Sequence, residues 1–368
     1  MKIKIIGVYF GTLPSYFQLW LDTVGRNPAF TWLLYTDADL AAYTCPENLR
    51  VIPCSFAQIK ERVQDKLGYA PDLTTPWGLC KFRVAFGKIF EDDLKDADYW
   101  GWTDFDVLYG DLTPVLRACE AGYDKILPLG HLSLVRNDAR LTTGILAHPL
   151  TRPILSQENP EKGSGCFDEI EFPSKILPSL SARQQNDIPF AHFYCRYGHF
   201  RIHAAEALYK RLGLTEGARP APVPCVFTWR DGHLHGWFAL PDRSVKKVEC
   251  VYIHFFRRDM SPRVAAFENG QAYLIVPNKI IAYDGHDLTW GEIAWLDRPR
   301  IHWRYFLKRL TVKKIAEKLS AQIRKSGPTV PCGSAPRPTV GASVPVARPD
   351  SPSHGRDRSP LRSDAGGK

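Results

Sequence analysis

The first 150 residues alternate between short apolar segments and stretches of helical periodicity. The apolar segments are typical of buried strands and cover residues 3–10, 31–36, 49–54, 98–109 and 124–129. Helical patterns lie between them, at residues 14–25, 56–68, 77–95 and 113–121. Strands that alternate with helices form βαβ units. This order therefore predicts a mainly parallel sheet, whose ligands bind beyond the carboxyl ends of its strands.

The pattern changes after residue 150. Between residues 221 and 284, short strand-like segments are separated by turn residues, and two pairs are typical of hairpins around Asp231-Gly232 and Asn269-Gly270. We therefore expect an α/β fold in which a mainly parallel sheet is followed by a smaller, partly antiparallel C-terminal part.

The basic character of the chain belongs to its C-terminal segments. The whole chain has a formal charge of +9. Residues 298–326 carry ten Lys or Arg and one acid, residues 327–368 carry six and three, and the remaining residues therefore sum to −3. Apolar residues at helical spacing predict a basic amphipathic helix over 298–326, and the Pro, Ser and Arg of 327–368 predict a disordered tail. The nearly neutral body argues against nucleic acid as a partner.

Several features indicate the compartment. The sequence has no run of 18 or more apolar residues, and its first residues, MKIKIIGVYFG, lack the cleavage site of a signal peptide. Its nine cysteines include no CxxC pair, which is typical of reduced thiols. We therefore expect a cytoplasmic protein, whose basic helix could attach it peripherally to the anionic inner face of the membrane.

The segment ADYWGWTDFDVLYGDL is the most informative about chemistry. An aromatic-rich strand leads into Asp104 and Asp106, which point to the same face of an extended chain. Two neighbouring carboxylates repel each other, and Mn²⁺ or Mg²⁺ bound between them would compensate both charges and leave positions for phosphate. Acids that only cap the helix predicted at 113 would give the same pattern, so this alternative stays open.

A second segment, KKVECVYIHFFRRDM, contains a strand that ends in His254 and is followed by Arg257 and Arg258. Imidazole is a suitable ligand for such ions, and paired guanidinium groups can bind the oxygens of a diphosphate. Together with the two carboxylates, this pattern indicates a metal-diphosphate site. A buried structural histidine is the alternative for His254.

The order of these motifs resembles a known class of enzymes. The strand and helix units, followed by WGWTDFDVLYGDL, GHLSLVRN at 130–137 and VYIHFFRR, are similar to the GT-A class of glycosyltransferases, which use nucleotide sugars. More closely, the chain resembles an uncharacterised group of sugar transferases from bacterial surface-polysaccharide loci, over about residues 3–260. The resemblance implies a catalytic domain at 1–297, with a nucleotide-binding half at 1–150 and an acceptor and metal half at 151–297.

The resemblance also implies which residues bind the donor. The loop of residues 7–11 would hold the nucleotide, and Asp37 would face the base or ribose. Lys81 and Arg83, about twenty residues before the paired acids, match the place where related transferases direct a basic residue toward the sugar or diphosphate.

For the metal, the resemblance implies that Asp104 approaches the ribose and the ion, that Asp106 binds the ion directly and that His254 is the third protein ligand. The chain departs from the best-known retaining relatives because HFFRR replaces HxxGxxK. Arg257 and Arg258 would then take the place of the phosphate-binding lysine, and whether the anomeric configuration is retained or inverted stays open.

Two further segments could contact substrates. In GCFDEIEF, Asp168 and Glu169 are candidates for the general base of an inverting enzyme, with an acidic surface turn as the alternative. In GHLSLVRND, Arg136 and Asn137 would face the donor sugar if the sheet continues as in the relatives, and an ordinary loop is the alternative.

These observations predict a metal-dependent hexosyltransferase. It would use Mn²⁺ or Mg²⁺ and move a sugar from a nucleoside-diphosphate sugar to a glycan or lipid-linked acceptor in surface-polysaccharide synthesis. The alternative is a catalytically inactive nucleotide-binding fold that acts as a binding protein through its basic C-terminal helix. A metal-dependent nuclease or phosphatase would need further carboxylates beside the pair.

Overall fold

The computed structural model describes residues 1–156, 167–192, 206–214, 223–255 and 260–297. The chain divides into two compact units, Met1–Trp303 and Arg304–Lys368, and every described residue belongs to the first. The predicted basic helix, the predicted tail, Arg257 and Arg258 lie outside the described residues. No helix in the described part of the chain is long and apolar enough to cross a membrane.

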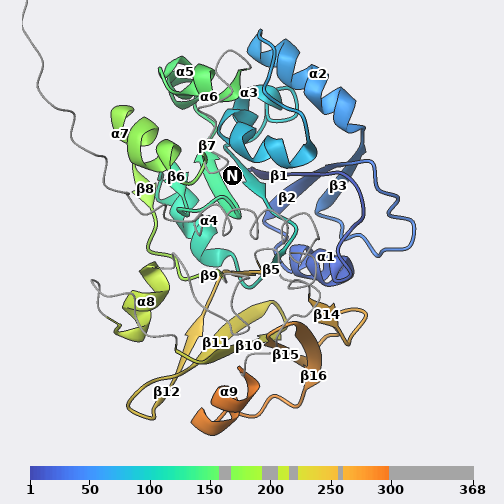
Figure 1. The fold of residues 1–368 in the computed structure, drawn as a ribbon, viewed down its shortest axis with the longest axis vertical. Coiled ribbons are helices and arrows are strands. Elements are labelled where there is room, and N and C mark those ends of the chain that lie inside the picture. The colour runs from blue at the N-terminus through green and yellow to red at the C-terminus, as the bar shows by residue number, and fades with distance from the viewer. Residues whose placement is uncertain (157–166, 193–205, 215–222, 256–259, 298–368) are drawn as a thin grey trace, which may run out of the picture. The chain divides into compact units, whose positions relative to one another are not determined.

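A seven-stranded sheet organises the first part of the chain (Figure 1). Its strands are β1 (Ile3–Tyr9), β2 (Phe30–Thr36), β3 (Leu49–Pro53), β4 (Tyr99–Thr103), β6 (Lys125–Ile126), β7 (Leu132–Arg136) and β8 (Gln184–Gln185). Their order is β3-β2-β1-β4-β7-β6-β8. β1 pairs in parallel with β2 and β4, whereas β7 is antiparallel to β4 and β6. The predicted α/β class with a mainly parallel sheet is therefore confirmed.

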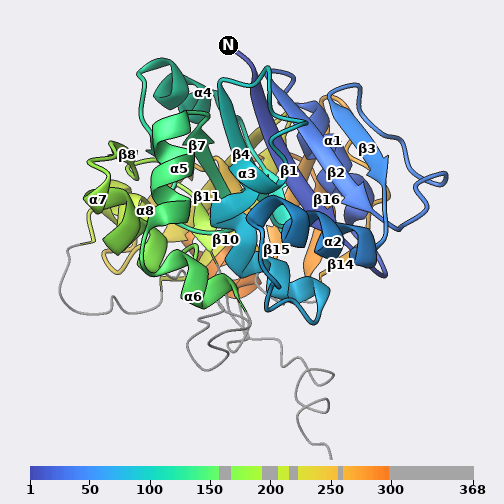
Figure 2. The ribbon, with the colours of Figure 1, turned by 90° about the horizontal axis from the view of Figure 1, so that it is seen from above.

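Both faces of this sheet are buried. The helices are α1 (Phe17–Gly25), α2 (Phe56–Leu67), α3 (Phe86–Ile89), α4 (Thr113–Glu120), α5 (Ala139–Ala147), α6 (Thr151–Leu155), α7 (Leu177–Ser179) and α8 (Glu206–Leu212), with a 3-10 helix at Pro76–Ala85 and a π-helical turn at Phe172–Ile176. Successive residues of a strand point to opposite faces, so Ile5 joins the core beside α1 and Ile6 joins the core beside α2 and α3. Figure 2 shows α2, α3 and α5 on one face and the C-terminal strands on the other.

The helix predicted over 77–95 is different in the structure, which has the 3-10 helix followed by the short helix α3. Leu79, Phe82 and Ala85 are buried at intervals of three residues, which is the period of a 3-10 helix. At Gly87 the chain lies so close to β4 that a Cβ atom would be 2.7 Å from the Trp100 indole. Packing against the sheet therefore decides the geometry of this segment.

The C-terminal part contains a six-stranded sheet in the order β12-β11-β10-β15-β16-β14. Its strands are β10 (Cys225–Arg230), β11 (His233–Ala239), β12 (Val245–Glu249), β14 (Ser261–Pro262), β15 (Ala272–Val276) and β16 (Lys279–Tyr283). One face, with Phe227 and Trp229, joins the main core, and the other packs with Trp237 against helix α9 (Trp290–Leu296). The smaller, partly antiparallel part is confirmed.

Of the two predicted hairpins, only one forms where it was expected. β10 and β11 meet around Asp231-Gly232, as predicted. The expected hairpin around Asn269-Gly270 is wrong, because β15 instead pairs with β16 across a turn at 277–278. Asn278 has a φ of 70° there, a conformation that asparagine tolerates better than most residues.

A three-stranded sheet, β5-β13-β9, connects the two parts. It consists of β5 (Val107–Tyr109), β13 (Tyr252–His254) and β9 (Ala191–His192). The single strand predicted over 98–109 is thus divided into β4 and β5, with residues 104–106 between them. This break brings the paired acids to the end of β13.

Candidate active site

The two acids of the DFD triplet lie where β4 leaves the parallel sheet. Phe105 between them is buried, with its ring centroid 5.0 Å from that of Trp20. The backbone is held on both sides of it: the Asp104 N–H donates to the carbonyl of His131 at 2.8 Å, and the carbonyl of Asp106 accepts from the Phe255 N–H at 2.8 Å. The buried phenyl ring thus anchors the turn between β4 and β5. The two carboxylates remain partly exposed, with 23% of the Asp104 side chain and 30% of the Asp106 side chain accessible.

His254 meets both acids. β13 is antiparallel to β5, and His254 is paired with Val107, the residue after Asp106. Its Nε2 is 3.0 Å from Asp106 Oδ1 and 3.8 Å from Asp104 Oδ2. Burial lowers the pKa of His254, but the two carboxylates outweigh burial and raise it above 6.5.

This group fits a divalent cation. One ligand atom from each of Asp104, Asp106 and His254 can be chosen so that all three lie within 4.8 Å of one another. Two carboxylate oxygens and one imidazole nitrogen are a donor set suited to Mn²⁺, with Mg²⁺ favoured less because of the nitrogen. The carboxylates repel each other, which a bound cation would relieve.

Strands β1, β2 and β4 are parallel neighbours, so their carboxyl ends lie at the same edge of the sheet. The loops that follow β1 and β2 therefore begin at the edge where β4 ends, beside the paired acids. Asp37 follows β2, and its Oδ1 accepts a hydrogen bond from the Gly11 N–H at 3.0 Å. Gly11 has a φ of 97°, which favours glycine. Gly7 has a packing role, because a Cβ there would lie 2.7 Å from the Phe105 ring. Asp37 and the loop that it holds therefore lie at the carboxyl edge of the sheet, and their role in binding a nucleotide stays a prediction.

Arg83 lies behind the paired acids and forms ion pairs with one of them, Asp104, and with Asp168. Its Nη2 is paired with Asp104, and its Nη1 donates to Asp168 at 3.1 Å and to the carbonyl of Gly130 at 3.0 Å. Its side chain is only 12% exposed. Burial alone would lower the pKa of Arg83, but the carboxylates outweigh it and keep the guanidinium charged. Arg83 therefore joins the acid pair to the segment around Asp168.

The structure places the two proposed general bases differently. Asp168 is buried, at 2% exposure, and burial raises its pKa to about 7 despite the bond to Arg83. This corrects the expectation that Asp168 meets an acceptor hydroxyl directly, and an acidic surface turn is excluded for it too. Glu169 is 28% exposed and accepts from the Gly130 N–H at 3.0 Å.

Two histidines that the motif analysis did not assign to the site pack against His254. The His131 ring stacks on that of His254, with centroids 3.6 Å apart, and its Nε2 is 3.6 Å from Glu169. His192 Nδ1 is 2.7 Å from His254 Nδ1. His192 follows an apolar segment, IPFAH, and its place at the end of a short strand was the only sequence signal. The three imidazoles form a second group that could offer metal ligands.

Three other expected donor contacts are not brought to this cluster. Arg136 pairs with Tyr99, at the opposite end of β4 from the acids, and donates to the carbonyl of Gly122. The Asn137 amide donates to the carbonyls of Leu94 and Ala97 at 2.9 and 2.8 Å. Because β7 is antiparallel to β4, these residues lie at the far edge of the sheet, which corrects their expected place at the donor sugar. Lys81 shares the 3-10 helix with Arg83, but its ammonium is paired with Asp72.

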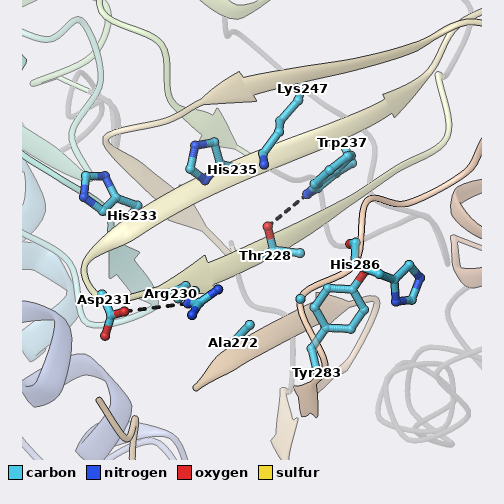
Figure 3. Close-up of a pocket in the computed structure, with 11 residues that line it drawn as sticks. Thr228, Arg230, Asp231, His233, His235, Trp237, Lys247, Ala272, Tyr283 and His286 are labelled. Carbon is cyan, nitrogen blue, oxygen red and sulfur yellow. Dashed lines mark hydrogen bonds and ion pairs between the residues drawn. The ribbon is translucent and has the colours of Figure 1, made fainter. Parts of the chain in front are cut away.

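A separate pocket of about 260 Å³ lies on the six-stranded sheet, on the face that also packs against α9 (Figure 3). On its floor, Trp237 Nε1 donates to Thr228 Oγ1 at 2.9 Å, and the Lys247 ammonium lies 4.5 Å from the Trp237 ring centroid. At its edge, His233 bonds to Glu249 at 2.7 Å. These polar groups are engaged with one another, so we place the candidate chemistry at the cluster of acids and His254.

Comparisons with solved structures give distant likenesses. The glycosyltransferase GlyE of Streptococcus pneumoniae TIGR4 has a TM-score of 0.31 and 11% identity, over 50% of this chain and 45% of that one. Mouse xyloside xylosyltransferase 1 has a TM-score of 0.31 and 9% identity, over 50% of this chain and 78% of that one. The bifunctional IspDF of Campylobacter jejuni has a TM-score of 0.27 and 10% identity, over 62% and 57%. At such TM-scores, nothing about this chain follows from these likenesses.

The sequence comparisons are more specific. No curated protein matches the chain. Residues 5–284, which include every described residue of the candidate site, match a family of unknown function (DUF6625). The chain therefore belongs to this family of unknown function.

Proposed function

We propose that this protein is a metal-dependent glycosyltransferase that moves a sugar from a nucleoside-diphosphate sugar to a glycan or lipid-linked acceptor. One observation carries the proposal: Asp104, Asp106 and His254, from distant parts of the chain, offer ligand atoms within 4.8 Å of one another. They do so beside the carboxyl edge of parallel strands, where α/β sheets bind nucleotides. The order of sequence motifs, which resembles that of GT-A enzymes, supports the same function.

The acids and His254 of the cluster, with a bound divalent cation, suit a nucleoside-diphosphate sugar as the donor. A divalent cation held by Asp104, Asp106 and His254 would supply positive charge to the diphosphate as it leaves the sugar. Arg83 holds Asp104 in place by an ion pair. The loop fixed by Asp37 and Gly11 would contact the nucleoside at the neighbouring strand ends.

The remaining acids divide between positioning and proton transfer. Asp168 orients Arg83 from a buried position, so it acts through Arg83 and not on the acceptor. Glu169 is the more accessible of the two and would be the general base if the reaction inverts the anomeric carbon. Attachment to a membrane through 298–326 stays a prediction, since this segment lies outside the described residues.

The test is the thermal stability of the full chain with Mn²⁺, with UDP or GDP, and with both. We expect Mn²⁺ to raise the midpoint of unfolding, and a nucleoside diphosphate to raise it further in the presence of Mn²⁺, because ligands that bind only the folded state stabilise it. Asp106→Asn and His254→Ala should each abolish the effect of Mn²⁺. Asp65→Asn, the same change at an exposed site on α2, is the matched control and should keep it.

Donor hydrolysis then tests the reaction itself. A panel of UDP- and GDP-sugars should include at least one that the protein hydrolyses slowly with Mn²⁺ present and that Asp106→Asn does not. If neither Mn²⁺ nor nucleotides change the melting temperature, the proposal is contradicted, and a binding protein that lacks catalytic activity is favoured.

A further inference from the structure

The backbone places His192 directly beside His254. β9 and β13 are parallel strands, and His192 is paired in register with His254. Side chains at paired positions of adjacent strands point to the same face of the sheet, about 5 Å apart. Both histidines are buried, at 6% and 2% exposure. Two imidazoles are therefore forced into contact where water has little access.

The two rings meet edge to edge. Their Nδ1 atoms are 2.7 Å apart, and their planes differ by 14°, with centroids 4.9 Å apart. A short nitrogen to nitrogen distance between nearly parallel rings is the geometry of an N–H···N hydrogen bond. His131 stacks over both rings, with centroids 3.6 Å from His254 and 4.4 Å from His192. This stacking restrains the ring planes.

The bond determines which nitrogen of His254 can bind a metal. A neutral imidazole carries one N–H, and a nitrogen that binds a cation must offer its lone pair. His254 Nε2 is the nitrogen that faces Asp106, at 3.0 Å. Its proton must therefore reside on Nδ1 when Nε2 binds a metal, and a buried N–H requires an acceptor. The lone pair of His192 Nδ1 lies at the required distance.

We propose that His192 is a positioning residue for the metal site: its Nδ1 accepts the hydrogen bond of His254 Nδ1–H and thereby directs Nε2 at the cation. The inference rests on the proposed function, because it needs the metal site. Histidine ligands usually donate their second N–H to a carboxylate, carbonyl or water, and here an imidazole takes that place. An imidazole nitrogen can accept or donate, so the same contact can persist while Nε2 donates to Asp106.

The experiment measures Mn²⁺ affinity directly, by the electron paramagnetic resonance signal of free Mn²⁺ in titrations of the full chain. His192→Phe keeps a ring of similar shape without an acceptor, and should weaken Mn²⁺ binding by about 10- to 100-fold, the range found for outer-shell partners. His192→Gln offers an amide oxygen as acceptor and should recover most of that loss. His235→Phe, at a half-buried histidine on β11, is the matched control and should bind as the native protein does.

The melting temperature without metal shows whether each variant is folded at the temperature of the titration. If folded His192→Phe binds Mn²⁺ as tightly as the native protein, the inference is overturned and the proposed function survives. If His192→Phe and His192→Gln weaken binding equally, an acceptor at this position restores nothing, and the acceptor role of His192 is overturned. If the native protein itself does not bind Mn²⁺, the proposed function falls and this inference with it.

Discussion

Replacing Asp168 by asparagine should change the way in which the stability of the protein depends on pH. Asp168 is 2% exposed, and burial raises its pKa from 3.8 to about 7. The folded state therefore binds a proton on this group over a pH range in which the unfolded chain has released it. Asparagine keeps the shape and can still accept a hydrogen bond from Arg83, but it does not titrate.

The size of the effect follows from the two pKa values. A carboxyl whose pKa is raised by folding stabilises the protein fully below the unfolded pKa, and this contribution is lost as the pH rises through the folded pKa. Between pH 5 and about pH 7 the loss is close to 1.4 kcal/mol per pH unit, or about 3 kcal/mol in all, and it levels off above pH 7. The free energy of unfolding of Asp168→Asn, relative to the native protein, should therefore rise by about 3 kcal/mol from pH 5 to pH 8.

The assay is urea unfolding at several pH values in buffer that contains a chelator, followed by tryptophan fluorescence. Trp20, Trp32, Trp100 and Trp102 are buried and should report the loss of the core. Asp65→Asn, the same change at an exposed position of α2, is the matched control. Parallel stability curves for Asp168→Asn and the native protein would refute the reasoning, since they would mean that Asp168 ionises as it does in water.

Three further predictions concern the same part of the molecule. Gly130→Ala should destabilise the protein by about 1–3 kcal/mol and weaken donor hydrolysis, because the added Cβ would be 2.4 Å from Asp168 Oδ2. The control is Gly291→Ala, whose Cβ would have no other atom within 4 Å. It should be neutral or stabilising in the same urea unfolding assay. Asn27→Ala should lower the free energy of unfolding by about 3 kcal/mol. The Asn27 amide donates to the carbonyls of Thr23 and Gly110 and accepts from the Leu112 N–H, and alanine would lose all three bonds. A loss below about 1 kcal/mol in urea unfolding would count against this reasoning. Mn²⁺ affinity should fall as the pH drops through the raised pKa of His254, approaching tenfold per pH unit, and a titration that is flat from pH 8 to pH 5 would argue against His254 as a ligand.

The sequence was informative where the structure depends on neighbours along the chain. The first three strands and helix α2 lie within two residues of the predicted bounds. Each has its own local signal, such as strand-like apolar runs or, for α2, the capping box formed by Ser55 and Gln58. The segment 77–95 had helical periodicity too, but in the structure it is a 3-10 helix followed by the short helix α3, where Gly87 packs against Trp100.

The site shows the same division. Asp104, Asp106 and His254 could be named as a group because their residue types are suited to a metal and follow strand-like runs. Arg136 and Asn137 were misplaced because their position depends on the direction of β7, which a strand pattern does not reveal. Asp168 is buried and bonded to Arg83, 85 residues away along the chain, a contact that no local pattern reveals.

The sequence by itself determined the α/β class, the positions of the early strands along the chain and the residue types from which a metal site could be built. Only the tertiary structure decided that the predicted strand 98–109 breaks, so that β5 pairs with β13 in a separate sheet. It also decided that β9 pairs with β13 and brings His192 beside His254. Periodicity and turn residues act over a few positions, and therefore they can be found along the chain. Contacts between strands 60 to 150 residues apart depend on which arrangement buries the most apolar surface and satisfies the backbone, and that is a property of the whole fold.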